Sequence, residues 1–284
     1  MKALVVGGSG FIGRHVCTGF KADEISYLSR HKSSDLDRKG IQWLEGSILD
    51  PDAVMNAVEG KDVVINCAGV WEDDAQAQFD TNVNGVKNIV AAIRKYDKDQ
   101  RFIHISAINI DYGTLEYYRT RRIAEGNVNL IKNSMVVRPS VVFGEGSRIA
   151  EDLRTLVHSD SYKYPDQGNL APVSVNDLVT VLNKAGDFKG SMNVCSRENI
   201  SMLELINAAR KKAGKGNVKG IRKFAKGMEK YIRKNENSFP LPAYRIRMLN
   251  QNYFRENTSL YRYVESPVSI NTFIEAFQED EQES

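Results

Sequence analysis

The chain has 284 residues, of which 42% are hydrophobic and 26% are charged. A chain of this length and composition can close a hydrophobic core as one large domain or two modest ones, which excludes a wholly disordered protein. The 39 Lys and Arg residues nearly balance the 36 Asp and Glu residues, so the net charge of +3 points to no particular class of partner.

Cysteine usage and hydropathy indicate the expected compartment. Cys17, Cys67 and Cys195 are too few and too widely spaced for a disulfide framework or a metal site, so we expect a reducing environment and no bound metal. No apolar run approaches the roughly 20 residues that a membrane-spanning helix needs. Met1 and Lys2 lead directly into a strand-like run, which does not resemble a signal peptide. These features predict a cytoplasmic protein, with attachment to a membrane surface as the alternative.

Four short apolar runs in the first half of the chain are rich in β-branched and aromatic residues. Such runs, bounded by Gly, Asp, Asn or Ser, are typical of strands buried on both faces of a parallel sheet. They are Ala3–Val6, Ile25–Leu28, Val63–Cys67 and Phe102–Ile105. Helical patterns lie between them at Phe11–Phe20, Pro51–Val58 and Val83–Tyr96, and Asp50 is the expected N-cap of the second. This alternation predicts an α/β fold with a doubly wound parallel sheet.

The second half of the chain is less regular. Ser134–Val137 resembles a further strand, and the alternation fades after about Gly146. Ser201 and Glu204 have capping-box spacing, which predicts a helix at Met202–Ala213. We therefore expect a first domain at residues 1–145, to which 172–196 returns, and a smaller C-terminal α/β lobe made of 146–171 and 197–284.

A glycine series follows the first predicted strand directly. Gly7, Gly10 and Gly13 form a G-x-x-G-x-x-G turn, and Phe11 and Ile12 open the helix that follows. Glycines permit a tight turn and a close approach of the backbone to a pyrophosphate, and the helix N-terminus supplies N–H groups and the positive end of a dipole. The series therefore predicts a dinucleotide site, and the alternative is a tight turn with an empty site.

Five later segments occur in the order found in one large enzyme superfamily. They are Asn66-Cys67-Ala68-Gly69, Thr81-Asn82-Val83-Asn84-Gly85, Phe102-Ile103-His104-Ile105-Ser106, Arg138-Pro139-Ser140-Val141-Val142-Phe143-Gly144 and Val173-Ser174-Val175-Asn176-Asp177. With the glycine turn they make residues 1 to about 180 resemble the short-chain dehydrogenase/reductase superfamily. The likeness is to its extended or atypical, NAD-dependent epimerase/dehydratase-like branch, akin to the 39-kDa (alpha subcomplex 9) subunit of respiratory complex I. The rest of the chain carries no motif that we can match.

This resemblance implies a Rossmann fold that binds a nicotinamide dinucleotide, with the C-terminal lobe holding the substrate. It implies that Ala68, Gly69, Asn82 and Pro139 lie along the cofactor and that Ser106 is the active-site serine. His15 and His104 have no acid at motif spacing, and we expect them to be structural. Cys67 is expected to be a small core residue rather than a nucleophile.

The choice between NAD(H) and NADP(H) depends on charge at the end of the second strand. NAD-preferring members of the family place a carboxylate there, where this chain has Ser29 followed by Arg30 and Lys32. Cations attract a 2′-phosphate that a carboxylate would repel, so we expect NADP(H) and keep NAD(H) as the alternative. These cations can equally belong to a solvated loop.

The family's chemistry uses a Tyr and a Lys four residues apart on one helix face. Here the pair is either Tyr117 with Arg121 or Tyr118 with Arg122, and Thr120 and Glu125 favour the first register. A cation favours the phenolate that proton transfer needs, but Arg cannot itself relay a proton. The family pattern implies that Arg121 also contacts the cofactor ribose.

Tyr117 follows Ser106 by only 11 residues, a shorter interval than catalytic epimerases usually have. The candidate catalytic set of Ser106, Tyr117 and Arg121 is therefore open to two interpretations. It is either an active redox site or an altered site that binds cofactor without turnover.

Residues 210–234 carry eleven basic residues against the single acid Glu229, a local charge of +10. Apolar residues recur at spacings of three and four, which predicts a basic amphipathic helix. They are Ile221, Phe224, Ala225, Met228, Tyr231 and Ile232, with Lys219, Arg222, Lys223, Lys226, Lys230 and Arg233 on the other faces. An anionic membrane surface or an acidic protein partner would suit such a helix, whereas an ordinary solvated face is the alternative and nucleic acid is not expected.

Two functions remain open from the sequence. The first is an NAD(P)(H)-dependent oxidoreductase that acts on a small carbonyl, hydroxyl or sugar-nucleotide substrate. The second is a catalytically weak NADPH-binding structural or regulatory protein, docked on a membrane or a larger complex as in complex I accessory subunits.

Overall fold

The computed structural model describes residues 1–96, 99–159, 162–221 and 225–276. They form two compact units, each built from several stretches of chain. The first comprises Met1–Pro139, Val175–Val194 and Arg262–Val264. The second comprises Ser140–Ser174, Cys195–Tyr261 and the described residues from Glu265 onward.

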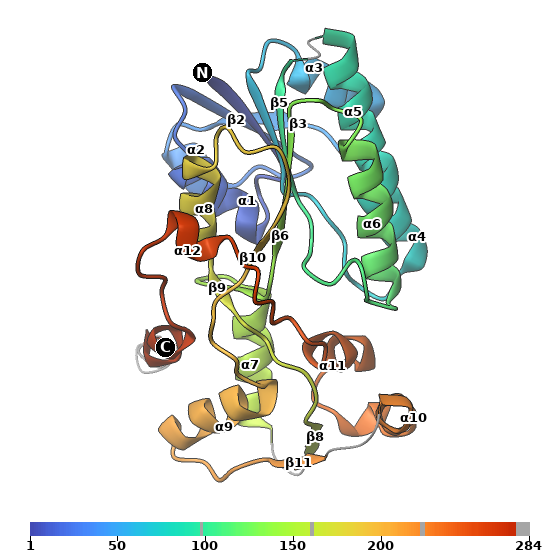
Figure 1. Cartoon of the computed structure of the whole chain (residues 1–284), viewed down its shortest axis with the longest axis vertical. Helices are drawn as coiled ribbons and strands as arrows, with labels where there is room; N and C mark the ends of the chain where they lie inside the picture. Colours follow the sequence, from blue (N-terminus) through green and yellow to red (C-terminus); the bar gives the residue numbers. More distant parts are fainter. Residues whose placement is uncertain (97–98, 160–161, 222–224, 277–284) are drawn as a thin grey trace. The chain divides into compact units, whose positions relative to one another are not determined.

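A seven-stranded parallel sheet forms the centre of the first unit (Figure 1). Its order is β10-β6-β5-β4-β1-β2-β3. The strands are β1 (Lys2–Val6), β2 (Glu24–Ser29), β3 (Gln42–Glu45), β4 (Val63–Asn66), β5 (Arg101–Ile105), β6 (Ser134–Pro139) and β10 (Gly190–Val194). The chain winds outward from β1 in both directions, which confirms the predicted doubly wound sheet and places the switch of direction between β1 and β4.

Helices cover both faces of this sheet. Figure 1 shows α1 (Phe11–Gly19), α2 (Ser34–Arg38) and α8 (Val175–Lys184) on one face. The other face carries α3 (Pro51–Val58), α4 (Ala75–Phe79), α5 (Gly85–Tyr96) and α6 (Glu116–Val128). A continuous apolar core lies under this second group and includes Val6, Ile89 and Phe102. Asp50 caps α3 as predicted, because its carboxylate accepts the backbone N–H of Asp52 at 3.0 Å.

Some elements of the first unit differ from the sequence prediction. The third predicted helix begins at Gly85 rather than Val83, because the five residues Asp80–Asn84 form a π-helical turn before it. That turn points the Asn82 side chain inward, where it bonds to the backbone of Val70. The edge strands β3 and β10 were not predicted, since each mixes polar and apolar residues in four or five positions.

Short strands and helices make up the second unit. Its two small parallel sheets pair β7 (Val142–Phe143) with β9 (Val173–Ser174), and β8 (Lys163–Pro165) with β11 (Lys219–Ile221). Its helical elements are α7 (Arg148–His158), α9 (Met202–Lys212), α10 (Ala225–Lys234), the turn Glu236–Ser238, α11 (Ala243–Leu249) and α13 (Ile270–Ala276). The chain changes unit within α12 (Leu260–Tyr263). The predicted capping box of α9 is present, with Glu204 N–H donating to Ser201 Oγ at 3.1 Å.

The basic segment is only partly the helix that the sequence predicts. Lys219–Ile221 is strand β11, because its backbone pairs with β8, and the helix begins at Ala225. Arg210 is buried and donates to the backbone carbonyls of Val157, Ser159 and Gly216, so it belongs to the interior and not to a surface. Arg222, Lys223 and Phe224 lie outside the described residues, as do the side chains of Ala225, Lys226 and Glu229.

In the described part of α10 the predicted amphipathic pattern is present. Met228 and Ile232 are buried, at 2% and 3% exposure. Lys230, Arg233 and Lys234 are exposed. The apolar stripe thus packs within the second unit and leaves the cations outward. None of the helices in the described ranges is long and apolar enough to cross a membrane.

Candidate functional site

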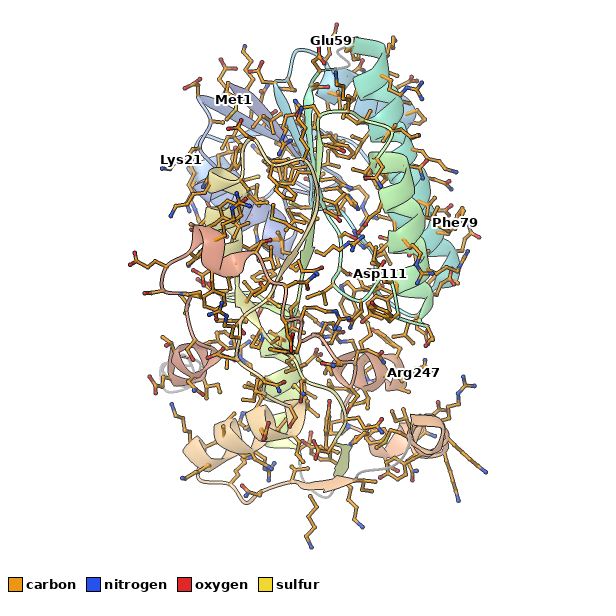
Figure 2. The ribbon with its side chains drawn as sticks, in the orientation of Figure 1. Met1, Lys21, Glu59, Phe79, Asp111 and Arg247 are labelled. Atoms are coloured by element: carbon orange, nitrogen blue, oxygen red, sulfur yellow. The ribbon has the colours of Figure 1, made fainter. Side chains whose placement is uncertain are left out.

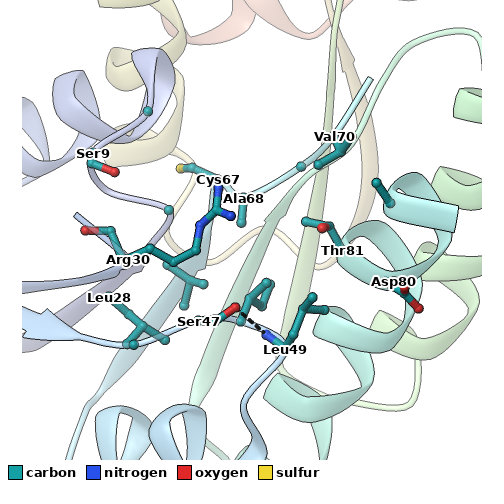
Figure 3. A pocket seen from close by; sticks show the side chains of 18 of the residues that line it. Ser9, Leu28, Arg30, Ser47, Leu49, Cys67, Ala68, Val70, Asp80 and Thr81 are labelled. Carbon is teal, nitrogen blue, oxygen red and sulfur yellow. Dashed lines mark hydrogen bonds between the residues drawn. The ribbon is translucent and has the colours of Figure 1, made fainter. Parts of the chain in front are cut away.

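A cleft of about 680 Å³ opens where the carboxyl ends of β1, β2 and β4 meet. This is the place at which the sheet changes winding direction, and open α/β sheets bind ligands at such a point. Its lining is Val6, Gly7, Ser9, Gly10, Leu28–Arg30, Gly46–Leu49, Cys67–Val70, Glu72, Asp74, Gln76, Ala77, Asp80 and Thr81. Figure 3 shows the Arg30 side chain in the cleft between Ser9 and Ala68.

The glycine turn forms one wall of the cleft. Gly7 has φ +77°, and a Cβ on it would lie 2.8 Å from the backbone of Ala68. A Cβ on Gly13 would lie 2.2 Å from the carbonyl oxygen of Gly7, so only glycine fits at both positions. Among the described residues no side chain caps α1 at Gly10, which leaves the first helical N–H groups, beginning with Phe11 and Ile12, for an external acceptor.

The segment that follows β4 forms the floor of the cleft. The N–H of Ala68 donates to Asn66 Oδ1 at 3.0 Å. Gly69 lies directly against Arg121, since a Cβ on Gly69 would be 1.8 Å from Nη2. The Asn82 amide bonds to the N–H and C=O of Val70 and donates to Thr120 Oγ1 at 3.1 Å. Asn82 therefore anchors the floor through Val70, and its side chain is occupied within the protein.

The end of β2 separates the three residues expected to select the cofactor. Ser29 is buried beside the cleft, and its hydroxyl donates to His31 O at 2.7 Å. Arg30 is exposed and lines the cleft. Lys32 does not line it, because its ammonium pairs with Asp37 at 2.7 Å.

The candidate catalytic residues come from β5 and α6. Arg121 is 6% exposed, and its Nη1 donates to the carbonyl oxygen of Ile105 at 3.0 Å. Its guanidinium carbon lies 5.3 Å from the centre of the half-buried Tyr117 ring. Ser106 directly follows β5, is buried, and its hydroxyl has no hydrogen-bond partner among the described residues. The structure thus brings Arg121 to the strand end that carries Ser106, with Tyr117 beside it.

The other possible register of the Tyr–Arg pair points elsewhere. Tyr118 is fully buried in a small cluster with Ala107 and Ile110. Arg122 is exposed, and its Nε donates to Ile110 O at 2.6 Å. These two side chains contact the loop after β5. The pair that lies at the strand end is therefore Tyr117 with Arg121.

An ionic network that the sequence did not reveal holds this loop to α6. Arg138 on β6 makes a two-pronged contact with Glu125, at 2.6 Å and 3.0 Å, and reaches Asp111 at 3.2 Å. The hydrogen bond to Glu125 raises the pKa of Arg138 further above its ordinary value. Pro139 ends the same strand, and its carbonyl accepts the N–H of Ile108 at 3.2 Å. Pro139 is thereby placed against the loop that joins Ser106 to Tyr117.

Figure 2 places Asp111 beside the amino-terminal end of α6, far from Met1 and Glu59, which lie near the amino ends of the central strands. Two members of the network, Glu125 and Arg138, could be singled out from the sequence because both belong to recognised motifs. The sequence contained no signal for Asp111. The lining at Gly46–Leu49 was missed for a related reason, since it follows the unpredicted strand β3.

Cys67 lines the cleft, but it is not poised as a nucleophile. Burial raises the pKa of its thiol, so the group remains protonated near neutral pH. Within the described ranges, no three His, Cys, Asp or Glu side chains gather closely enough to hold a metal ion.

Comparison with known proteins identifies the first unit. Residues 3–128 match the sequence model of the NAD dependent epimerase/dehydratase family. This part of the chain therefore resembles that family. The match confirms the resemblance seen in the sequence, and it spans the glycine turn, the floor of the cleft and all of α6.

Two relatives illustrate the range of proteins that this chain resembles. A 2-alkyl-3-oxoalkanoate reductase from Stenotrophomonas maltophilia is 28% identical over 186 residues, covering 54% of this chain and 56% of the relative. The NADH dehydrogenase [ubiquinone] 1 alpha subcomplex subunit 9 of Mus musculus is 25% identical over 159 residues, covering 51% and 42%. The chain thus spans about half the length of these relatives.

The fold extends over the whole chain in solved structures. UDP-glucuronic acid 4-epimerase from Bacillus cereus, in complex with UDP-glucuronic acid and NAD, has a TM-score of 0.72 and 17% identity, with complete coverage of both chains. At this identity the likeness concerns the fold alone. It includes the second unit, for which the sequence offered no motif.

The glycine turn supplies a direct test of the site. We expect Gly13→Ala to weaken dinucleotide binding by at least about tenfold, because the added methyl group collides with the Gly7 carbonyl and displaces the turn. Isothermal titration with NADPH and NADH measures the effect. Gly186→Ala is the matched control, since a Cβ there meets nothing within 4 Å. Unchanged affinity in Gly13→Ala would place the ligand elsewhere.

Proposed function

We propose that the chain binds NADP(H) in this cleft and acts as an oxidoreductase on a small carbonyl, hydroxyl or sugar-nucleotide substrate. The observation that carries the proposal is the uncapped N-terminus of α1, which opens at a turn where no side chain fits at Gly7 or Gly13. Such a cradle suits a pyrophosphate, because backbone N–H groups can approach it closely. The reductase activity named for the Stenotrophomonas relative supports the reaction class.

The charges at the end of β2 support NADP(H) over NAD(H). Arg30 lies in the cleft, and Ser29 stands where a carboxylate would repel a 2′-phosphate. A guanidinium can make two parallel hydrogen bonds to a phosphate, which favours Arg30 as the residue that recognises it. Lys32 pairs with Asp37 and does not line the cleft, so we assign the main contact with the 2′-phosphate to Arg30.

At the nicotinamide end of the cofactor, side chains of this chain would transfer the proton and orient the substrate. The nicotinamide supplies or accepts a hydride when it is bound. Tyr117 gives or takes the proton at its phenol oxygen, and the Arg121 guanidinium lies beside its ring. Ser106 Oγ is buried and has no partner in the described part of the chain, so it would be free to orient the substrate oxygen.

Cofactor selection is tested at Arg30. We expect Arg30→Ala to weaken NADPH binding about tenfold or more, because it removes a charge-assisted bond to the 2′-phosphate. NADH affinity should change little. Lys32→Ala, which removes a neighbouring cation outside the cleft, is the control and should leave both affinities near those of the wild type. Equal affinity of the wild type for both cofactors would refute the preference.

Turnover is tested at the two neighbouring tyrosines. With a panel of carbonyl substrates, Tyr117→Phe should lower the rate of NADPH oxidation by about 10²–10⁴-fold, since a general acid is lost. Tyr118→Phe is the control, because that ring packs in the cluster under the loop. Arg121→Lys should preserve or raise the rate. A loss of turnover confined to Tyr118→Phe would shift the catalytic register by one residue.

A second function is favoured by the position of Arg121. Its guanidinium is buried, donates to Ile105 O and packs on Gly69. These contacts hold it at the strand end and limit its movement during a reaction. We propose as the alternative that the chain binds NADPH without turnover and docks on an anionic surface through the exposed cations of α10 and its neighbours. The likeness to the mouse NADH dehydrogenase subunit supports this alternative.

Docking is tested with lipid vesicles. We expect the chain to co-sediment with phosphatidylserine-containing vesicles at low salt and less at physiological salt, because each exposed cation contributes about 1 kcal/mol near an anionic surface. Lys230→Glu combined with Lys234→Glu should abolish binding, whereas Lys39→Glu with Lys87→Glu, the same charge change on the first unit, should not. Retention by uncharged vesicles alone, or equal effects of the two variants, would rule out this surface.

A further inference from the structure

A side-chain pair joins the ends of β4 and β5 beneath the floor of the cleft. Asn66 and His104 are register partners on these parallel strands, and both are 0% exposed. Asn66 Nδ2 lies 3.1 Å from His104 Nδ1. Sequence analysis classed His104 as structural because no acid accompanies it, but this contact connects it to the cofactor cleft.

The hydrogen bonds determine which ring nitrogen of His104 carries the proton. Asn66 Oδ1 accepts the N–H of Ala68 at 3.0 Å, which fixes the orientation of the amide. The NH₂ group, which can only donate, then faces His104, so Nδ1 must be the acceptor. The proton of the neutral ring is therefore on Nε2. Rotating the Asn66 amide would bring two donors together at Ala68.

Charge and burial keep this ring neutral. The pKa of His104 is lowered to about 3, first by burial and then by the nearby cation of Arg121 on α6. A protonated ring would carry a hydrogen on Nδ1 and could not accept from Asn66. The acceptor at Nδ1 is thus present throughout the physiological pH range.

The Asn66–His104 pair fixes the position of the Ala68 backbone, because the Ala68 N–H donates to Asn66. This backbone already lies so close to Gly7 that a Cβ on Gly7 would be 2.8 Å away. A rotation of Asn66 would release the Ala68 N–H and let the floor shift against the glycine turn. Figure 3 shows Ala68 facing the cleft beside Cys67 and Arg30.

We infer that His104, as the neutral Nε2–H tautomer, is a positioning residue for the dinucleotide site: it holds Asn66, which holds the Ala68 amide and so the floor of the cleft. This role rests on the proposed cofactor binding and adds a residue that touches no ligand. Arg121 packs against the same floor from the α6 side at Gly69.

Two substitutions of His104 distinguish the effect of its hydrogen-bond acceptor from the effect of its ring packing. In His104→Asn the amide oxygen stands the same number of bonds from Cα as Nδ1 and can accept from Asn66, but the ring volume is lost. In His104→Phe the ring remains beside Phe102, and the acceptor is lost. We expect His104→Phe to weaken NADPH binding about tenfold and His104→Asn to weaken it less than threefold, although Asn leaves a cavity and should have the lower melting temperature.

Phe102→Leu is the matched control, since it lies on the same strand and face and only packs in the core. It should lower the melting temperature and leave NADPH affinity unchanged. If affinity in all three variants followed stability, or if His104→Phe bound as tightly as the wild type, the positioning role would be excluded. Failure of the wild type to bind either cofactor would instead reject the proposed function.

The tautomer is tested on the unliganded wild type, without any binding measurement. A two-bond ¹H–¹⁵N spectrum of the imidazoles resolves the four histidines, and His104→Asn identifies the signal of interest. We expect a neutral ring with its proton on Nε2 from pH 5 to pH 8. A proton on Nδ1, or titration of this ring near the ordinary pKa of about 6.5, would overturn the inference.

Discussion

The close contact between the glycine turn and the segment after β4 governs the geometry of the whole site. β1 and β4 are neighbours in the sheet, and Gly7 and Ala68 follow their ends so tightly that a Cβ on Gly7 would lie 2.8 Å from the Ala68 backbone. Because nothing larger than a hydrogen atom fits there, the first turn of α1 and the floor of the cleft have fixed positions relative to each other. The glycine turn and the floor therefore shape the cleft together.

Hydrogen bonds from buried polar side chains hold α6 and the floor of the cleft in place. Arg121, Arg138 and Asn82 are held by backbone carbonyls, a carboxylate and backbone groups of the floor. These bonds link α6 and the turn before α5 to strand ends and to the floor of the cleft, and among the described residues Arg121 Nε is a buried donor without a partner. The same bonds make the Arg121 cation a fixed charge. A fixed charge can stabilise a developing phenolate, but it cannot deliver a proton.

In the second unit some cations are buried and others are exposed. Arg210 is buried against three carbonyl oxygens, and Arg245 forms a buried ion pair with Asp152 that joins α11 to α7. Lys230 and Lys234, in contrast, remain on the solvent side of α10 because its apolar stripe is taken up by packing. The high local charge of residues 210–234 is thus divided between interior scaffolding and an exposed face. Only the exposed part is available to a partner.

Local patterns in the sequence by themselves determined the central strands, the glycine turn and the caps at Asp50 and Ser201. These features depend on neighbours within a few positions, so buried runs, glycine spacing and capping residues suffice to predict them. Spacing on one helix also selected Tyr117 and Arg121 over the adjacent pair.

Tertiary structure alone decided the features that depend on contacts between distant residues. The edge strand β3 and the strand β11 exist because a partner strand supplies their hydrogen bonds, and no local pattern marks them. Arg30 reaches the cleft and Lys32 does not, because Asp37 holds Lys32. The His104 tautomer follows from the Ala68 amide, 36 positions earlier in the chain. A hydrogen bond of this kind satisfies a buried group only where the fold brings its partner, and one-dimensional spacing does not record that position.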